Sequence, residues 1–522
     1  MNVVTTAQMR EIDALTITEF ETPGVELMDR AGEGLAHIVD ELARLSGFVS
    51  APVRLFAGKG NNGGDIFVAA RYLKDREYRV EVWLAGEKKR IGGDARKHLD
   101  RMERAGIVLE EVSTPGEWEA MTAAGPCGDG IVVDGILGTG ITGPARGVAA
   151  AAIQFINRLS ETSLVVAADV PSGLDSDTGE AAGDTVHADL TATIGLPKVG
   201  LLKPAAIECV GSIEVVDIGI PSELVARYET SASLIARDDV RRLLPSRARS
   251  SHKGTYGHVL VVGGAPGFSG AVALAVRAAL RSGAGLVSAL VPSSVWPIVA
   301  GMVPEAMIHP GKVSDEGGLS SDALDRTTLD LDAVDAILVG PGLTTGPGVR
   351  SIVEQLLRQG TKPLIIDADG LNVIGADVDV IRASGAPVIV TPHPGEMSRL
   401  TGLSTDAIQQ DRWGTAQALA DATETVVVLK GAGTVVASPG RPLSVNVTGN
   451  PGMARGGMGD VLGGMIASLV AQGLAPPDAA AAAVYLHGRC GDRVAWLGAQ
   501  AGMLAGDVIE ELMHGFAELT PR

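Results

Sequence analysis

A short loop near the start of the chain has the composition of a ligand-binding loop. Residues 58–65 read GKGNNGGD, follow an apolar run and precede a helical pattern. The glycines match the GxGxxG fingerprint, which admits a pyrophosphate to a helix N-terminus. However, the carboxylate of Asp65 would repel a phosphate there, which weakens a plain dinucleotide-binding interpretation. The alternative is structural, an Asn/Gly turn in which Asp65 only caps the helix.

Two further aspartates close apolar runs and are followed by glycine-rich segments. Asp134 ends IVVD and precedes GILGTGITGP, whose backbone N–H groups suit a phosphate. Asp169 ends SLVVAAD and precedes VPSGLD. A single Asp at a strand end is often only a helix cap. Because ligands bind at the carboxyl ends of strands in open parallel sheets, the three loops together predict a binding site.

The second half of the chain carries residues suited to phosphoryl transfer. The segment GGMGD at 456–460 opens an apolar helix. Its glycine turn presents free N–H groups to a phosphoryl oxygen, and Asp460 can take a proton from an attacking hydroxyl. The alternative is that Asp460 only caps its helix. KGAGT at 430–434 follows another apolar run, and no GxxxxGK[ST] motif occurs, which excludes P-loop chemistry.

His393 is the one histidine whose surroundings indicate a function. It lies between two prolines in TPHPGE, directly after an apolar run. This position is too rigid and too polar for a core histidine. We therefore expect His393 to contact a ligand.

The elements that must position these residues follow from hydrophobic patterning. From Val53 onward, short runs of β-branched residues alternate with Ala-rich helical stretches, including helices around 66–74 and 94–105. The pattern lapses near residue 220, and GHVLVVGG at 257–264 starts a second series. Such alternation is typical of mainly parallel sheets. We therefore predict an α/β fold of two domains, residues 1–225 and 235–522.

Length and charge agree with a folded protein of several domains. A chain of 522 residues is expected to form two to four domains. Its net charge of −19 leaves no basic surface for non-specific binding of nucleic acid or anionic membranes. The uncharged run 282–304 is long enough to span a bilayer, but proline and glycine interrupt it, so we expect buried core segments.

Cysteine usage predicts a cytoplasmic protein. Cys127, Cys209 and Cys490 lie far apart without CxxC spacing, which argues against both a disulfide framework and a zinc site. The first 15 residues contain Arg10, Glu11 and Asp13 and lack the apolar region of a secretory signal.

Four motifs of the first half carry a family resemblance. GNNGGD, VDGILGTG, DVPSGLDSDTG and GLPKVGLL together resemble the NAD(P)H-hydrate epimerase domain of bifunctional NAD(P)H-hydrate repair enzymes, across about 1–220. The resemblance implies a three-layer, Rossmann-like domain that interconverts the R and S epimers of hydrated NAD(P)H. It also implies that Asp169 or Lys198 is the acid or base. The implied K⁺ ligands are Asn62, Asp134 and Ser172. The implied contacts to the hydrate are Asn61, Asn62, Gly63, Gly64, Asp65, Gly138, Thr139, Gly140, Ile141, Thr142, Gly143, Pro144 and Asp169.

The second half resembles the ribokinase-like superfamily, and within it the ADP- or ATP-dependent NAD(P)H-hydrate dehydratase. The matching segments over 253–460 are KGTYGHVLVVGG, GFSGA, GPGL, DADGLN, TPHPGE, KGAGT and NPGMARGGMGD. The resemblance implies a three-layer domain in which the hydroxyl of the S epimer is phosphorylated by ADP with Mg²⁺ and eliminated. NAD(P)H, AMP and phosphate result, with Asp460 as the catalytic base. The implied hydrate contacts are Ala271, Gly342, His393 and Asp460. The implied ADP contacts are Lys430, Gly431, Ala432, Gly433, Thr434 and Gly459.

Two other functions stay open at this point. The second half could be a small-molecule kinase of the same fold, such as a thiamine-precursor kinase, and the first half a non-catalytic module for nucleotide or protein binding. The fused epimerase-like half argues against the kinase. The joint presence of the polar residues named above argues against the non-catalytic module. The expected partners are NADH hydrate, NADPH hydrate, ADP and further copies of the chain in a homo-oligomer, without nucleic acid or membrane.

Overall fold

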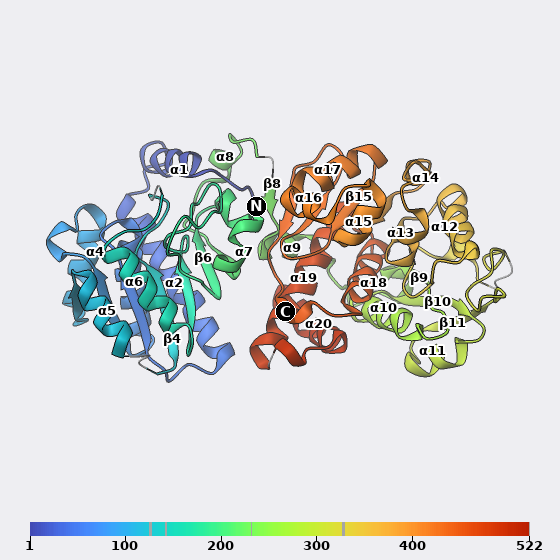
Figure 1. The fold of residues 1–522 in the computed structure, drawn as a ribbon, viewed down its shortest axis with the longest axis horizontal. Helices are drawn as coiled ribbons and strands as arrows, with labels where there is room; N and C mark the ends of the chain where they lie inside the picture. Colours follow the sequence, from blue (N-terminus) through green and yellow to red (C-terminus); the bar gives the residue numbers. More distant parts are fainter. Residues whose placement is uncertain (125–127, 141–142, 231, 326–328, 499, 521–522) are drawn as a thin grey trace. The chain divides into compact units, whose positions relative to one another are not determined.

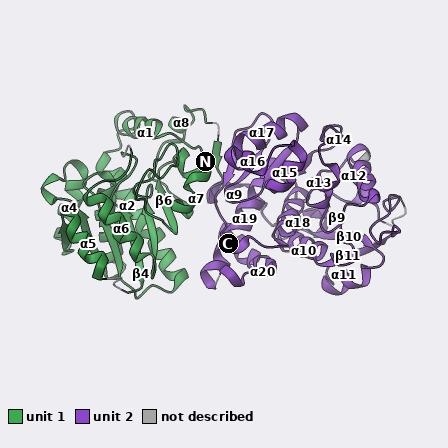
Figure 2. Cartoon of the chain, viewed as in Figure 1, with its two compact units in different colours: residues 1–234 green, residues 235–522 purple. Residues whose placement is uncertain are grey.

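The described residues of the chain form two compact units. The structure, a computed structural model, describes every residue except 125–127, 141–142, 231, 326–328, 499 and 521–522. The units comprise Met1–Leu234 and Ile235–Arg522 (Figure 2). Each is built from a central sheet with helices packed on it (Figure 1). The predicted fold class, two α/β domains, is confirmed.

The sheet of the first unit has seven parallel strands in the order β3-β2-β1-β4-β5-β6-β7. Strands β2 and β3 lie on one side of β1, whereas β4 to β7 follow on the other side. The order therefore reverses between β1 and β4, and a crevice forms at the carboxyl ends of the strands at such a point. The strands are β1 (Val53–Ala57), β2 (Val80–Ala85), β3 (Leu109–Val112), β4 (Gly130–Gly135), β5 (Ser163–Ala168), β6 (Leu190–Ile194) and β7 (Ser212–Val216).

Helices complete a three-layer arrangement in this unit. α2, α3 and α4 contact one another, and α5 packs on α6. Phe56 of β1 packs against Trp118 of α5 and Phe155 of α6, so these two helices cover one face of the sheet. The α-helices are α1 (Thr6–Thr18), α2 (Gly24–Ser46), α3 (Asn61–Asp75), α4 (Gly93–Arg104), α5 (Pro115–Ala124), α6 (Val148–Leu159), α7 (Ile207–Val210) and α8 (Ser222–Val225). The short 3-10 helices are η1 (Lys88–Arg90), η2 (Val199–Leu202) and η3 (Pro204–Ala206).

The second sheet has ten strands in the order β11-β10-β9-β12-β13-β14-β15-β16-β17-β8. Strands β9 to β15 pair in parallel, whereas β16 is antiparallel to both of its neighbours. The strand order reverses between β9 and β12, which places a second crevice there. The strands are β8 (Ala232–Leu234), β9 (His258–Val262), β10 (Leu286–Pro292), β11 (Met307–Gly311), β12 (Ala336–Val339), β13 (Leu364–Ile366), β14 (Val388–Val390), β15 (Val426–Leu429), β16 (Thr434–Ala437) and β17 (Leu443–Asn446).

The larger core of this unit lies between the sheet and α10, α18, α19 and α20. α18 is apolar nearly all round and is almost completely buried. The α-helices are α9 (Arg237–Leu243), α10 (Ser269–Arg281), α11 (Trp296–Met302), α12 (Pro347–Gln359), α13 (Asp369–Ile374), α14 (Asp379–Arg382), α15 (Pro394–Thr401), α16 (Thr405–Gln410), α17 (Arg412–Thr423), α18 (Met458–Ala471), α19 (Pro476–Leu497) and α20 (Ala505–Leu519). The 3-10 helices are η4 (Lys253–Tyr256), η5 (Leu331–Ala333), η6 (Pro451–Met453) and η7 (Gln500–Gly502).

The uncharged run 282–304 contains a strand and a short helix of this unit. β10 is almost completely buried, as expected of a core segment. α11 buries only Val299 and exposes Trp296, Ile298 and Met302, so the expectation of a buried segment is wrong for this helix. Among the residues that the structure describes, no helix is both long and apolar enough to cross a membrane.

Candidate active sites

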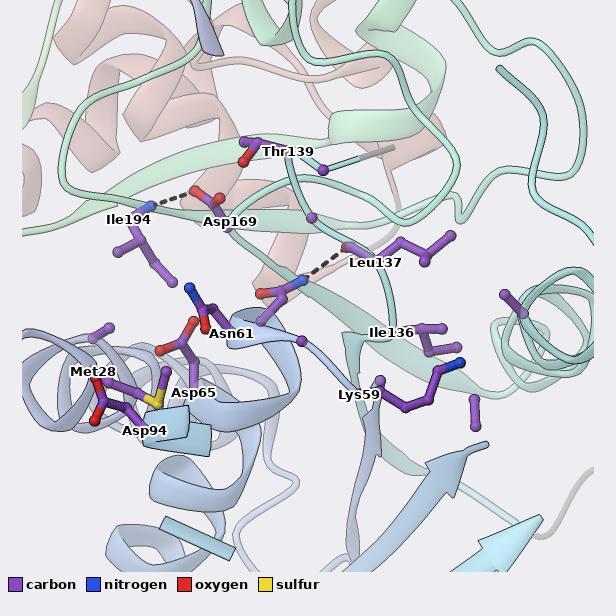
Figure 3. A pocket seen from close by; sticks show the side chains of 18 of the residues that line it. Met28, Lys59, Asn61, Asp65, Asp94, Ile136, Leu137, Thr139, Asp169 and Ile194 are labelled. Carbon is purple, nitrogen blue, oxygen red and sulfur yellow. Dashed lines mark hydrogen bonds between the residues drawn. The ribbon is translucent and has the colours of Figure 1, made fainter. Parts of the chain in front are cut away.

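A cavity of about 1060 Å³ lies in the first unit where the loops after β1, β4 and β5 meet (Figure 3). Four predicted contacts that the structure describes do not line this cavity, namely Gly63, Gly64, Gly143 and Pro144. Ile141 and Thr142 lie outside the described part of the chain. The predicted site residues that line the cavity are Asn61, Asn62, Asp65, Gly138, Thr139, Gly140, Asp169 and Lys198. The structure therefore brings residues of four separate sequence motifs to one place.

The turn from β1 into α3 is tight because its glycines leave no room for side chains. A Cβ on Gly63 would lie 2.0 Å from the carbonyl oxygen of Gly58. The helix begins at Asn61, earlier than the sequence pattern predicts. Asp65 is therefore a full turn inside α3 and is buried. The interpretation of Asp65 as a helix cap is wrong, since its carboxylate is part of the cavity lining.

Asp134 forms a buried polar centre beneath the cavity. Its carboxylate accepts hydrogen bonds from the backbone N–H of Ser172 (2.8 Å), from Ser172 Oγ (2.7 Å) and from the N–H of Ile136 (3.2 Å). The side chain is completely buried, and this burial raises its pKa to about 6. Asp134 thus ties the end of β4 to the loop after β5.

Asn62 leaves one buried oxygen without a partner. Its Nδ2 donates to the carbonyl oxygen of Leu137 (2.8 Å), whose own N–H donates to Ser172 Oγ (2.8 Å) (Figure 3). No hydrogen bond to the buried Asn62 Oδ1 is found among the described residues. An unsatisfied buried acceptor is costly unless a ligand or ion completes it.

Asp169 and Lys198 form an ion pair at the cavity wall. Lys198 Nζ is buried and donates to the Asp169 carboxylate, to the carbonyl oxygen of Ile194 (2.8 Å) and to Thr193 Oγ1 (3.5 Å). Its three N–H donors therefore all have acceptors. The N–H of Ile194 also donates to Asp169 (3.1 Å; Figure 3). Asp169 has a φ of 66°, a strained conformation of the kind that clusters at functional sites.

Two more carboxylates contribute to the electrostatics of this cavity. Burial, reinforced by the charges of Asp169 and Asp13, raises the pKa of Asp65 well above its usual range, although Lys198 opposes the shift. Burial also raises the pKa of Asp13 to about 6. Asp13 lies on α1 and lines the cavity, although it is not among the site residues predicted from the sequence. A single aspartate on a helix gives no local signal of such a role.

In the second unit, Lys430 follows β15 and makes contact with two buried carboxylates. Its Nζ lies 2.6 Å from Asp367 Oδ1 and 3.7 Å from Glu396 Oε2. Burial opposes the charge of Lys430, but the two carboxylates outweigh burial and raise its pKa. A Cβ on Gly459 would lie 3.4 Å from this Nζ, so the loop after β15 and the GGMGD turn meet here.

Asp460 lies in the first turn of α18 beside these groups. The N-cap of the helix is Gly457, with a φ of 93°, and no hydrogen bond to the Asp460 side chain is found among the described residues. The interpretation of Asp460 as a helix cap is therefore wrong. Burial, together with the charge of Asp367, raises the pKa of Asp460 to about 7, although Lys430 opposes the shift. A carboxylate with this pKa is suited to proton transfer near neutral pH.

Of the remaining predicted residues of this unit, His393 and Gly342 lie just after strands, whereas Ala271 lies in the first turn of α10. His393 follows β14 and caps α15, because its Nδ1 accepts hydrogen bonds from the N–H of Gly395 (2.9 Å) and of Glu396 (3.3 Å). Its Nε2 stays on the exposed part of the ring, 3.4 Å from Glu396 Oε1. Gly342, with a φ of 63°, approaches Ala271 so closely that a Cβ on it would lie 3.1 Å from the Ala271 Cβ.

The KGAGT segment turns directly from β15 into β16. Gly431 and Gly433 both have positive φ values, 141° and 64°. Thr434 Oγ1 donates to the carbonyl oxygen of Gly431 (2.8 Å), which closes the turn. Ala432 lies at its exposed tip. The backbone N–H groups of such a turn suit a phosphate or a nucleotide.

Two residues near this site were missed in the sequence. Asp367, directly after β13, accepts hydrogen bonds from Lys430 Nζ and from Thr391 Oγ1 (2.7 Å). Asp492 of α19 accepts from the N–H of Gly449 (2.9 Å) and from Asn450 Nδ2 (3.0 Å), and so fixes the segment that leads to the GGMGD turn. Asp367 lies in the motif DADGLN, which could have identified it. Asp492 has no comparable signal.

Comparisons with known proteins place both halves of the chain in known families. Residues 24–200 match the family model described as YjeF-related protein N-terminus, and 259–514 match the model for NAD(P)H-hydrate dehydratase. The bifunctional NAD(P)H-hydrate repair enzyme Nnr of Moorella thermoacetica is 42% identical over 98% of this chain and 96% of its own length. The chain belongs to the family of bifunctional NAD(P)H-hydrate repair enzymes. The resemblance predicted from the motifs is thereby confirmed.

Other members of the repair enzyme family show the same full-length match. The enzyme of Escherichia coli is 35% identical over 94% of this chain and 89% of its own length. Among solved structures, the ADP/ATP-dependent NAD(P)H-hydrate dehydratase of Bacillus subtilis, co-crystallised with ATP and Mg²⁺, is 33% identical. The match covers 55% of this chain and 98% of the Bacillus subtilis chain, and its TM-score is 0.49.

Proposed function

We propose that the chain repairs hydrated NAD(P)H in two steps, epimerisation in the first unit and ADP-dependent dehydration of the S epimer in the second. The observation that carries this proposal is the full-length match to bifunctional repair enzymes. The cavity at the strand switch of the first unit and the Lys430–Asp460 cluster of the second support it. Residues 1–225 and 235–522 are the proposed domains of the two activities.

In the first unit, the cavity has the size for one nucleotide-like ligand. The proposed hydrate contacts are the predicted residues that line the cavity, namely Asn61, Asn62, Asp65, Gly138, Thr139, Gly140 and Asp169. Backbone N–H groups of the two glycine-rich loops would take the phosphates, which leaves the carboxylates near Lys198 for the hydrated ring.

The donor set beneath this cavity fits a K⁺ ion. Asn62 Oδ1 is buried without a partner, and the Asp134 carboxylate has one acceptor site left beyond its three hydrogen bonds. Ser172 Oγ supplies a third oxygen, and oxygen ligands of low total charge suit a large monovalent cation. No group of three or more His, Cys, Asp or Glu side chains suited to a metal occurs in the part of the chain that the structure describes. The ion would neutralise Asp134 and fix the three loops.

In the second unit, Asp460 accepts the proton of the hydrate hydroxyl while the hydroxyl oxygen attacks the terminal phosphoryl group of ADP. N–H groups in the first turn of α18 stabilise the charge on that group, and AMP leaves. The nitrogen lone pair of the ring then expels phosphate, and loss of a proton from the neighbouring carbon restores the double bond. In this proposal Lys430 to Thr434 and Gly459 hold the nucleotide, whereas Ala271, Gly342 and His393 contact the hydrate.

Mg²⁺ would enter this site with the nucleotide. Asp367, Asp369 and Glu396 all raise the pKa of Asp460 through their charges, so the cluster carries an excess of negative charge. A nucleotide-bound divalent cation would offset this excess and neutralise the phosphoryl oxygens.

The partners, the assembly and the compartment of the enzyme are also proposals. Hydrated NADH and NADPH and ADP are the proposed small-molecule partners, and a homo-oligomer is the expected assembly. The cytoplasm is the expected compartment, since the described cysteines Cys209 and Cys490 are unpaired and buried.

Product analysis with the purified S epimer tests the dehydratase proposal against a kinase. The full-length protein is incubated with the S epimer of NADH hydrate, ADP and Mg²⁺. We expect one AMP and one phosphate for each NADH formed. A stable phosphorylated product without NADH would instead assign the second unit to the small-molecule kinases.

A further inference from the structure

A carboxylate that the proposed epimerisation leaves without a role faces the Lys198–Asp169 pair. Asp13 lines the same cavity, and its charge interacts with those of Lys198 and Asp169. Its charge also acts on Asp65, which is buried in α3 and lines the same cavity. Among the described residues, no hydrogen-bond donor engages Asp13 or Asp65. Both carboxyl groups are therefore available to a ligand.

Backbone hydrogen bonds hold α1, which carries Asp13, next to the segment that contains Lys198. Val4 exchanges backbone hydrogen bonds with Pro197 and Val199, both 3.0 Å, and these two residues flank Lys198. The start of α1 is therefore fixed to the segment that carries Lys198. Asp13 follows in the third turn of this helix.

A second contact links α1 to the glycine-rich loop of the cavity. Arg10 donates from Nη2 to the carbonyl oxygen of Thr139 (2.9 Å). Asp13 is three residues further along and therefore lies on the same face of α1 as Arg10. This face is the one that closes the cavity, because Met9, Arg10, Asp13 and Ile17 all line it.

Inversion of the hydrate requires two proton transfers. Hydration of an enamine places the hydroxyl on the carbon that is bonded to the ring nitrogen. When the nitrogen lone pair breaks this C–O bond, the departing oxygen takes one proton and leaves as water. A water molecule that adds to the other face of the ring cation forms a new C–O bond and releases one proton. An acid and a base are needed, and the net change in protons is zero.

We propose that Asp13 is a catalytic residue of the epimerase site, which exchanges the proton with the hydroxyl on one side of the ring while Asp65 serves the other side. This inference rests on the proposed function. The Asp169 carboxylate, fixed by Lys198, stabilises the ring cation between the two steps. Lys198 is then a positioning residue, since all its N–H donors have acceptors.

The electrostatics of the cavity agree with this division of roles. The charges of Lys198 and Asp169 act on Asp13, and the charge of Asp13 acts on Asp65. Burial raises the pKa of Asp13 to about 6 and that of Asp65 well above its usual range. The pair therefore holds a proton at a pH where ordinary carboxyl groups are ionised, as an acid catalyst must.

The test measures conversion of the R epimer of NADH hydrate to the S epimer by the full-length enzyme without ADP. We expect Asp13→Asn to lower kcat about 10²-fold with an unchanged KM, and Asp13→Glu to restore part of the loss. The matched control is Glu11→Gln, which removes an exposed carboxylate from the same helix outside the cavity. It should convert the epimers at the wild-type rate. Amide hydrogen exchange at wild-type rates in peptides of the first unit shows that this unit is folded in each variant, and ADP-dependent recovery of NADH from the S epimer shows that the second unit is intact.

The pH profile separates proton transfer from a merely structural role. Wild-type activity should fall as the pH rises above about 6, because Asp13 loses its proton there, and Asp13→Asn should lack this limb. An Asp13→Asn variant with unchanged kcat, or with a raised KM at unchanged kcat and pH profile, overturns the role of Asp13 alone. A wild-type enzyme that does not convert the epimers overturns the proposed function and the role of Asp13 with it.

Discussion

Asp460 is the residue on which the proposed dehydration depends most. It lies beside Lys430 and three carboxylates, and it makes no hydrogen bond of a helix cap. Lys430 is held in place by Asp367, so the positive charge and the base have fixed relative positions. The same principle applies in the first unit, where Lys198 fixes Asp169.

Removal of the proposed base should separate the two activities. We expect Asp460→Asn to lower ADP-dependent NADH formation from the S epimer about 10²-fold or more, as for loss of a general base. Epimerisation should be unchanged, because Asp460 belongs to the second unit only. Chromatography of the epimers and the absorbance of NADH measure the two reactions. Recovery of NADH at a near wild-type rate would show that Asp460 is not the base.

The raised pKa of Asp460 predicts the pH dependence of dehydration. A protonated carboxyl group cannot accept the hydroxyl proton, so kcat/KM should rise with pH and level off above about 7. Below that pH the rate should fall about tenfold per unit, since the ionised fraction falls by this factor. The profile is measured with the S epimer and a fixed concentration of Mg²⁺ and ADP. A flat profile from about pH 5.5 to 8, a range that spans this pKa, would contradict the assignment of Asp460 as the base.

At the scale of elements, the loops after β1, β4 and β5 act together. Asp134 joins the end of β4 to Ser172, and Asn62 joins α3 to Leu137. Their positions depend on one buried cluster, whose unpaired oxygen is Asn62 Oδ1. A cation in this cluster would stabilise all three loops at once.

Replacement of K⁺ by Li⁺ in the buffer of the full-length enzyme tests whether this cluster binds a cation. We expect K⁺, compared with Li⁺, to slow amide hydrogen exchange in peptides covering 58–65 and 134–140, because ligand binding stabilises the native state by mass action. Li⁺ is too small for a site of these oxygen ligands. Asp134→Asn keeps the shape of the side chain but removes its charge, and the effect of K⁺ should then disappear. Equal exchange in K⁺ and Li⁺, or an unchanged response in the variant, would remove the ion from the account.

The sequence predicts these loops better than the helices around them. Asp134 and Asp169 were found because buried parallel strands are continuous apolar runs, so a carboxylate at their end is conspicuous. The start of α3 was placed too late, since the segment NNGG has low helix propensity. Tertiary contact overrides propensity there, as Gly63 packs directly on the backbone of Gly58. Asp13 was missed because its role depends on partners more than 50 residues away in the sequence.

At the scale of the whole molecule, each unit has its own strand switch and its own set of loops. The two series of apolar runs in the sequence were sufficient to predict this division. The fused pair of family resemblances was sufficient to predict the family, which is confirmed over the full length. The contacts of Asp367, Asp492 and Lys198 required the structure, since they join residues from different elements.

The division predicts that the two activities can be separated. We expect fragments 1–225 and 226–522, expressed apart, to fold and to keep epimerase and dehydratase activity respectively, because this cut leaves the edge strand β8 with the second sheet. Mixed together, they should convert both epimers to NADH. Circular dichroism and the two activity assays check this. Insoluble fragments, or a dehydratase that needs the first unit, would show that the units share part of their stability.

The most direct test of two-step repair, epimerisation followed by dehydration, uses the R epimer alone. The full-length enzyme is given pure R epimer of NADH hydrate with ADP and Mg²⁺, and the absorbance of NADH is followed beyond the rate of spontaneous epimerisation. We expect complete recovery of NADH, with one AMP formed for each, since the first unit supplies the S epimer that the second consumes. Recovery from the S epimer but none from the R epimer would contradict it, because the first unit would then not be an epimerase.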